Sequence, residues 1–140
     1  MELNRKAKGD LAELKVATDL RDRGYKIAIP YGEDWDFDLI LCRANGALER
    51  VQVKYVRSDG RIIMVRPRSE SLTNGRVRAI KYYTAATIDW LAFWDATADR
   101  CYYVPAAELG AGMSSLSLRV APTLNKQARG IRFADDYTTI

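Results

Sequence analysis

The apolar positions near the start of the chain recur with the period of an α-helix. Asn4 is a good residue to begin a helix and Gly24 a good residue to follow one, so we expect a helix that runs to about Arg23. At 100° per residue, one apolar arc is expected to contain Ala7, Leu14, Val16, Ala17 and Leu20. The opposite side of the helix is expected to carry Lys8, Lys15, Asp19 and Asp22.

Glu13 falls inside this apolar arc, on the stripe that contains Gly9, Val16, Ala17 and Leu20. An ionised carboxylate that faces a core is costly unless a cation or hydrogen-bond donors meet it. We therefore expect Glu13 to face a functional site. The alternative is a core carboxylate that is paired with a cation.

Beyond the helix, short apolar runs alternate with turn residues, which is typical of β-strands. Pro105 is expected to begin a short helix that ends near Gly110. The segment 67–78 is rich in polar residues and arginine but has no periodicity, so we expect a mobile basic loop there. Strands are expected at residues 25–29, 37–42, 49–56, 62–66, 90–95, 101–104 and 115–120.

The Asn-Gly turn at residues 45–46 joins two of these strands and decides which residues face each other. A two-residue loop would put Asp38 opposite Val53, whereas a three-residue loop, with the glycine at positive φ, puts Asp38 opposite Gln52. We predict the second register. Because side chains alternate along a strand, this register gathers Asp38, Gln52 and Lys54 on one surface, as a metal-dependent phosphodiesterase requires.

The charge of the chain is unevenly distributed. With 140 residues, of which 48% are hydrophobic, we expect one domain that spans residues 1–140. Its net charge is only +4, but in residues 57–81 seven cations stand against two carboxylates. This clustering indicates a phosphate-binding surface, and the simpler interpretation is a solvated strand face. The seven cations are Arg57, Arg61, Arg66, Arg68, Arg76, Arg78 and Lys81.

The chain contains no histidine. This excludes serine-histidine and cysteine-histidine hydrolases, histidine-ligated zinc sites and nucleases whose general base is imidazole. Cys42 and Cys101 each lie within an apolar run, and in the absence of a signal peptide we interpret them as buried, reduced thiols of a cytoplasmic protein. No apolar run approaches the roughly 18 residues that indicate a membrane span.

The order of the polar residues resembles that of the PD-(D/E)XK nuclease superfamily, with a helix glutamate at Glu13, a hairpin aspartate at Asp38 and then Gln52-Val53-Lys54. No proline precedes Asp38, and an amide stands in the second acidic position, a departure for which the group I intron-encoded homing endonuclease branch is also known. The chain resembles this branch in particular. The further matches are Lys8-Gly9, Gly24-Tyr25, Phe37-Asp38-Leu39-Ile40, Tyr82-Tyr83, Ile88-Asp89 and Tyr102-Tyr103-Val104-Pro105.

The resemblance implies an α/β (α+β) fold with a restriction-endonuclease-like core, in which a central mixed β-sheet is flanked by helices. It also implies that Asp38 binds Mg²⁺ directly, with the amide oxygen of Gln52 and the backbone carbonyl of Val53 as further ligands. Glu13 is expected to supply a second carboxylate ligand or to hold a metal-bound water. Lys54 is expected to hold the attacking water or the scissile phosphate. Mn²⁺ is expected to substitute for Mg²⁺.

The function implied by the resemblance is Mg²⁺-dependent hydrolysis of phosphodiester bonds in double-stranded DNA, at the long site of a homing endonuclease. A chain of 140 residues cannot span such a site, so we expect a homodimer or homotetramer with one active site per subunit. Two alternatives remain open. One is a Holliday-junction resolvase, and the other is a DNA-binding module of the same fold that has lost catalysis, with Gln52 as the visible lesion.

Simpler interpretations of the same residues also remain open. A Gln-x-Lys or Glu-x-Lys triplet arises by chance about once in a chain of this size, so Gln52 and Lys54 could be the solvated face of a hairpin and Asp38 a strand cap. Asp34 and Asp36 are interpreted as loop acids. Asp36 would take the place of Asp38 if the predicted register were wrong.

Overall fold

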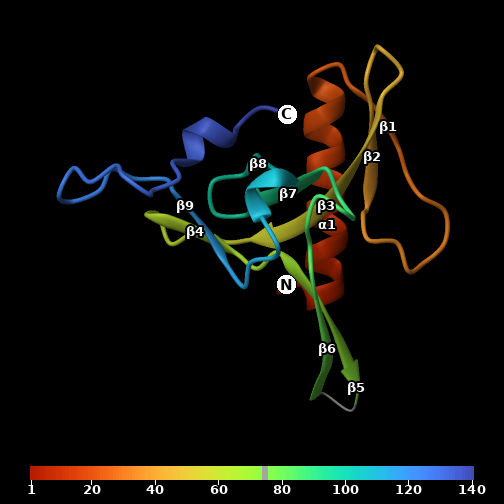
Figure 1. The fold of residues 1–140 in the computed structure, drawn as a ribbon, viewed down its shortest axis with the longest axis horizontal. Coiled ribbons are helices and arrows are strands. Elements are labelled where there is room, and N and C mark those ends of the chain that lie inside the picture. Colours follow the sequence, from red (N-terminus) through yellow and green to blue (C-terminus); the bar gives the residue numbers. More distant parts are fainter. Residues whose placement is uncertain (74–75) are drawn as a thin grey trace.

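The computed structural model describes the backbone of residues 1–73 and 76–140, and the side chains of these residues except 70–73, 77 and 78. The described residues form one long helix, several short strands and two 3₁₀ helices (Figure 1). In chain order the elements are α1 (Arg5–Asp22), β1 (Lys26–Ala28), β2 (Leu39–Cys42), β3 (Leu48–Val56), β4 (Ile62–Val65), β5 (Arg68–Thr73), β6 (Arg76–Tyr82), β7 (Trp90–Asp95), β8 (Arg100–Pro105), η1 (Ala106–Leu109), β9 (Leu116–Arg119) and η2 (Ala134–Tyr137).

Five strands form a central mixed sheet in the order β1-β2-β3-β7-β8. Strands β3 and β7 are parallel, and the other neighbours are antiparallel. Helix α1 packs on one face of this sheet, and the β4–β9 ribbon packs on the other (Figure 1). The predicted α+β fold with a central mixed sheet is confirmed. The second face is covered by this ribbon and by η1 rather than by a long helix.

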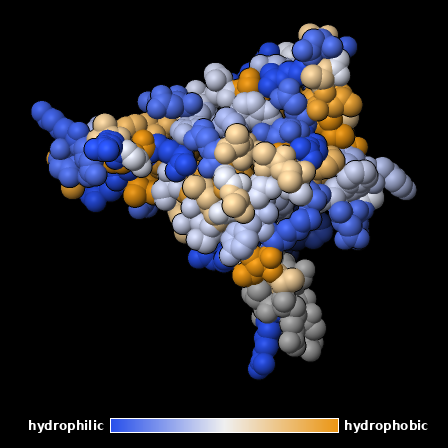
Figure 2. Space-filling view, in the orientation of Figure 1, coloured by the Kyte–Doolittle hydropathy of each residue, from blue (hydrophilic) through white to orange (hydrophobic). Residues whose placement is uncertain are grey.

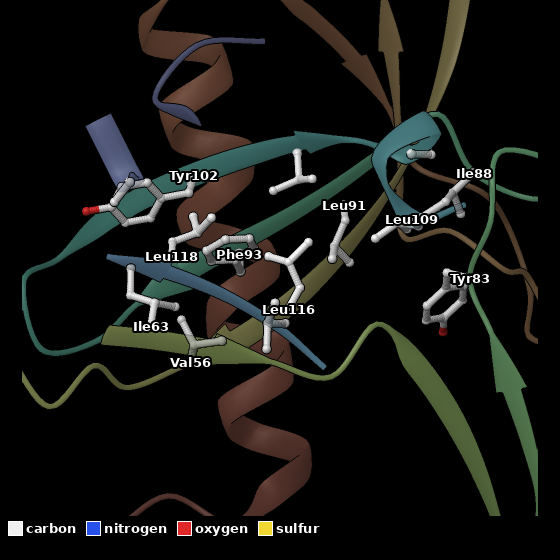
Figure 3. Packing of buried hydrophobic residues seen from close by; sticks show 14 residues of the cluster. Val56, Ile63, Tyr83, Ile88, Leu91, Phe93, Tyr102, Leu109, Leu116 and Leu118 are labelled. Atoms are coloured by element: carbon white, nitrogen blue, oxygen red, sulfur yellow. The ribbon is translucent and has the colours of Figure 1, made fainter. Parts of the chain in front are cut away.

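Alternation along the central strands supplies both cores. On the α1 face, buried Val51 and Val53 of β3 belong to the same core cluster as the helix residues Val16 and Leu20. On the opposite face, Phe93 of β7 packs among the side chains of the β4–β9 ribbon, as Figure 3 shows. Consequently Gln52 and Lys54, which alternate with the two valines, point away from α1.

Local capping residues set the ends of α1. The side chain of Asn4 accepts a hydrogen bond from the backbone N–H of Ala7 at 2.9 Å, and Gly24 leaves the helix at φ 91°. The predicted apolar arc is right for Val16 and Leu20 and wrong for Leu14. Ala12, Val16 and Leu20 are the buried residues, and the side chain of Leu14 is 66% exposed. The polar residues expected on the outer side include Lys15, whose ammonium lies 5.1 Å from the centroid of the Trp94 ring, and Asp19, which accepts a hydrogen bond from the Tyr103 hydroxyl.

The predicted hairpin register is confirmed. Leu39 pairs with Val51 and Cys42 with Leu48, so the residue before Leu39 lies across from Gln52. The turn closes through the N–H of Arg43, which donates to the carbonyl of Ala47 at 2.8 Å, and Gly46 has φ 91°. This is the three-residue loop with glycine in the left-handed region.

The prediction of a basic loop at residues 67–78 is wrong. Strands β5 and β6 pair as an antiparallel ribbon, with Arg68 opposite Tyr82 and Ser69 opposite Lys81. The ribbon stands away from the body of the molecule (Figure 1, Figure 2). The described side chains of β6 are exposed, and a strand whose side chains face solvent needs no apolar alternation, which agrees with the lack of periodicity in this sequence.

The other predicted strands match the structure to within two residues at each end. The short helix predicted after Pro105 is the 3₁₀ helix η1. Both cysteines are free thiols, and burial raises the pKa of Cys101 to about 12. In the described ranges, 1–73 and 76–140, none of the helices has the length and apolar character needed to span a membrane.

Candidate active site

The site forms where β3 extends beyond its neighbour β2. Strand β2 begins at Leu39, opposite Val51, so the edge of β3 that faces β2 opens at the next residues. There the N–H of Val53 donates to Oδ2 of Asp38 at 2.9 Å. The backbone N–H of Asp38 donates to the carbonyl of Val51, also at 2.9 Å, which fixes the aspartate beside this edge. The Asp38 carboxylate therefore lies against the backbone of Val53.

Gln52 connects these two groups. Its Nε2 donates to Oδ2 of Asp38 at 2.9 Å and to the carbonyl oxygen of Val53 at 3.2 Å, and the residue is 8% exposed. The sequence predicted that the amide oxygen would face the site. In this structure the NH₂ group faces the two oxygens instead, because it can donate to both of them whereas an amide oxygen can only accept. A turn of the amide about its last bond would bring its oxygen to the same position.

Glu13 reaches Asp38 from helix α1. Burial, followed by the charge of Asp38 and a hydrogen bond with it, raises the pKa of Glu13 to about 7. Burial also raises the pKa of Asp38, against the opposing effects of the Val53 N–H, the hydrogen bond with Glu13 and the charge of Lys54. Each of the two carboxyl groups is therefore easier to protonate than an exposed carboxyl group. The expectation that Glu13 faces the site agrees with this geometry.

Lys54 lies on the same face of β3 as Gln52, two residues further along. Its Nζ donates to the backbone carbonyl of Arg68 at 2.8 Å and lies 5.4 Å from the centroid of the Tyr83 ring. Tyr83 is 5% exposed and belongs to the cluster shown in Figure 3. The ammonium is thus held at the point where the β5–β6 ribbon leaves the body.

The two loop acids lie outside this cluster. Asp36 forms an ion pair with Lys81, with 2.6 Å between Oδ1 and Nζ, and Asp34 is exposed at φ 65°. Since the register places Asp38 beside Gln52 and Val53, Asp36 is not needed in its place.

A family model for PD-(D/E)XK endonucleases matches residues 3–140 of this chain. The chain belongs to this family. Among solved structures, the bacterial homing endonuclease I-Ssp6803I is similar, with a TM-score of 0.74 and 20% sequence identity over 96% of this chain and 88% of that one. At this identity the likeness concerns the fold. No curated protein matches the sequence. The predicted superfamily is confirmed, and the protein is a nuclease of the PD-(D/E)XK type.

The donor set of this PD-(D/E)XK site fits a hard divalent cation. The Asp38 carboxylate and the Val53 carbonyl converge on one polar group, the Gln52 amide, and Glu13 supplies a second carboxylate. Magnesium prefers oxygen ligands and retains several waters, so one or two carboxylates suffice. Among the described residues no group of three or more His, Cys, Asp or Glu side chains is placed to hold a metal.

A basic cleft opens next to this PD-(D/E)XK site. It has a volume of about 1000 Å³ and lies between the first half of α1 and the chain from β4 to the start of β5. Carboxylates are absent from its described lining, which also includes backbone and side chains of residues 53–56. Three of its cations, on α1, were not predicted from the sequence, although they occur within four residues before Gly9. The lining cations are Arg5, Lys6, Lys8, Lys54, Arg66 and Arg68.

The seven cations predicted to contact DNA have different surroundings. Arg66 and Arg68 line the cleft. Arg57 donates to the hydroxyl of Tyr55 at 3.2 Å, and Arg61 lines a separate pocket with Arg119. The remaining three belong to the β6 strand: Arg76 is exposed, Lys81 pairs with Asp36, and the side chain of Arg78 lies outside the described residues.

Proposed function

We propose that this nuclease is a Mg²⁺-dependent DNA endonuclease that hydrolyses phosphodiester bonds in double-stranded DNA at a specific long site, as a homing enzyme does. The proposal is supported most by the position of the Gln52 amide, which lies within hydrogen-bond distance of both Asp38 and the Val53 carbonyl. That position can hold a cation at the edge of the sheet, on the face that carries Lys54. The fold likeness to a bacterial homing endonuclease is consistent with it.

Each residue of the site has a role in the proposed reaction. Asp38 and the Val53 carbonyl would hold the cation, and Gln52 would present its amide oxygen without adding a negative charge. Bound Mg²⁺ would neutralise charge on the phosphate and favour ionisation of a water. Glu13, with its raised pKa, would hold that water and accept its proton. Lys54 would donate a hydrogen bond to the scissile phosphate or to the attacking water.

The basic cleft suits the backbone of the duplex. Six cations line it, and its lining includes Val53 and Lys54 of the proposed site. Phosphate neutralisation by Lys and Arg supplies most of the sequence-independent affinity for DNA. We propose that one strand passes along this cleft and that two or four subunits, each with one active site, act on one DNA site. The free thiols of Cys42 and Cys101 are consistent with the cytoplasm as the place of action.

Plasmid cleavage tests this function. Wild-type protein is expected to cut double-stranded DNA that carries the intronless allele of the host gene, with Mg²⁺ or Mn²⁺ and not with EDTA. Asp38→Asn and Lys54→Met should lower the rate at least about 100-fold while DNA binding persists. Wild-type protein that binds DNA but never cuts it with either metal would instead be a binding module. Cutting of four-way junctions of any sequence, with no linear site cut, would indicate a junction resolvase.

A further inference from the structure

At the end where the β5–β6 ribbon joins the body, one of its strands contacts the candidate site and the other contacts the segment just before Asp38. On β5, the carbonyl of Arg68 accepts the hydrogen bond from Lys54 at 2.8 Å. On β6, the ammonium of Lys81 lies 2.6 Å from Oδ1 of Asp36. Ser69 pairs with Lys81 across the ribbon, so both contacts come from the same end.

Asp36 belongs to the short segment that positions Asp38. Phe37, which lies between them, is half-buried and packs against the core cluster under the β4–β9 ribbon, and its ring centroid is 5.4 Å from that of Trp35. Asp38 then joins the β3 edge through its own N–H. The Asp36 to Lys81 contact therefore ties the metal-binding segment to one strand of the ribbon, while the Arg68 carbonyl ties Lys54 to the other.

The same contact argues against a direct role of Lys81 on DNA. A carboxylate at 2.6 Å neutralises most of the local field of the ammonium, and a phosphate would have to displace it. The two side chains are 55% and 32% exposed, so the pair lies at the surface and is expected to contribute little to folding stability. Its effect on the site is expected to be one of geometry, because a misplacement of about 1 Å can slow a reaction roughly 100-fold.

We propose that Lys81 is a positioning residue for the nuclease reaction. Its ion pair with Asp36 fixes the segment that bears Asp38. The same ribbon fixes Lys54 through the Arg68 carbonyl, so the two contacts set the position of Asp38 relative to Lys54. This inference rests on the proposed function of the site. The ribbon would then position the site in addition to any contact with DNA, because a displacement of its base would move both the Asp38 segment and Lys54.

A charge swap tests the proposal. Lys81→Asp and Asp36→Lys each place like charges together, and each should lower the single-turnover rate at saturating DNA about 10-fold or more, with DNA affinity changed less than about threefold. The double variant Asp36→Lys with Lys81→Asp restores the pair in reverse and should recover most of the rate. Lys81→Met and Asp36→Asn, which avoid like charges, should give smaller losses of the same kind.

Lys15→Asp is the matched control, because it reverses the charge of another surface ion pair, with Asp99 at 3.3 Å, away from the basic cleft. Its rate should stay within about twofold of the wild type. The proposal is overturned if Lys81→Asp weakens DNA binding about 10-fold at an unchanged saturated rate and the swap recovers nothing. Lys81 would then be a phosphate contact.

A second measurement separates this proposal from the proposed function. Mn²⁺ affinity, measured by calorimetry without DNA, should fall in each single variant and recover in the swap, because Asp38 binds the ion. If wild-type protein did not cut DNA, the proposed function would be wrong. The Mn²⁺ affinities of the variants would still show whether Lys81 positions the Asp38 segment. The positioning role would be overturned if the wild type, Lys81→Asp, Asp36→Lys and the double variant had equal Mn²⁺ affinity and, where they cleave DNA, equal rates at saturating DNA.

Discussion

Gln52 lies directly across the β2–β3 hairpin from Asp38, with its amide nitrogen 2.9 Å from Oδ2 of the aspartate. The same nitrogen lies 3.2 Å from the Val53 carbonyl. An uncharged NH₂ group thus satisfies two oxygens that are chemically suited to a divalent cation. The proposal that this family member uses an amide in place of a second acid can be tested at this contact.

Gln52→Glu should destabilise the metal-free protein. The substitution removes two hydrogen bonds and adds a third carboxylate beside Asp38 and Glu13, so the free energy of unfolding in EDTA at pH 8 should fall by about 2 kcal/mol. Mg²⁺ should restore more stability to this variant than it adds to the wild type. Gln52→Met loses the same hydrogen bonds without adding charge, so Mg²⁺ should stabilise it no more than it stabilises the wild type. Urea unfolding of the wild type and the two variants, with and without Mg²⁺, measures these differences.

The pH dependence of stability should report the raised pKa of Glu13. A carboxyl group whose pKa is raised in the folded protein stabilises it fully below the unfolded value of about 4.5, and this contribution is lost as pH rises through about 7. In EDTA the free energy of unfolding of wild-type protein should therefore decline between about pH 4.5 and 7.5. Glu13→Gln should remove much of this decline. Parallel pH curves for the two proteins would contradict the assignment.

Much of the fold follows from local signals. Asn4 and Gly24 set the ends of α1, and the glycine at position 46 sets the hairpin register that brings Asp38 to Gln52. The rotation of α1 about its axis could not be predicted in the same way. Lys15 packs its ammonium over Trp94, a strand residue far away in the sequence, and Leu14 is left in solvent.

The sequence predicted the central residues of the candidate site, but not the charged residues that surround them. The hairpin register and the resemblance together identified Asp38, Gln52 and Lys54 as neighbours, and the structure brings them together. The cations of α1 were missed because only folding brings them beside Arg66, about sixty positions later. The ion pair of Lys81 with Asp36 could not be predicted either, because a charge count along the sequence does not show which carboxylate a cation meets.

Two glycines should respond to alanine with opposite signs. Gly46 has φ 91°, so Gly46→Ala should lower the free energy of unfolding by about 1 kcal/mol, although no atom lies within 4 Å of the added methyl group. Gly9 lies in the interior of α1 with equal space and no positive φ, so Gly9→Ala should raise it by up to about 1 kcal/mol. Chemical denaturation of both variants checks the predicted turn and the helix independently. A stabilised Gly46→Ala would contradict the three-residue loop.

The cleft cations should determine the salt dependence of DNA binding. Lys8, whose ammonium lies 5.6 Å from the Tyr55 ring centroid, lines the cleft. Lys8→Gln should weaken binding to any duplex and reduce the slope of log affinity against log salt by about 0.9, the value for one phosphate contact. Lys26→Gln removes the same charge from an exposed position of β1 that does not line the cleft. An equal change in both variants would show a general effect of net charge.

The central claim is that Asp38, Gln52, Val53 and Glu13 surround one divalent cation. A crystal structure of the wild-type protein with Mn²⁺, located by its anomalous scattering, measures this most directly. The ion is expected within coordination distance of the Asp38 carboxylate and the Val53 carbonyl, with the Gln52 amide turned so that its oxygen faces the metal. The claim is contradicted if Mn²⁺ binds elsewhere, or not at all, while Nε2 of Gln52 stays between the two oxygens.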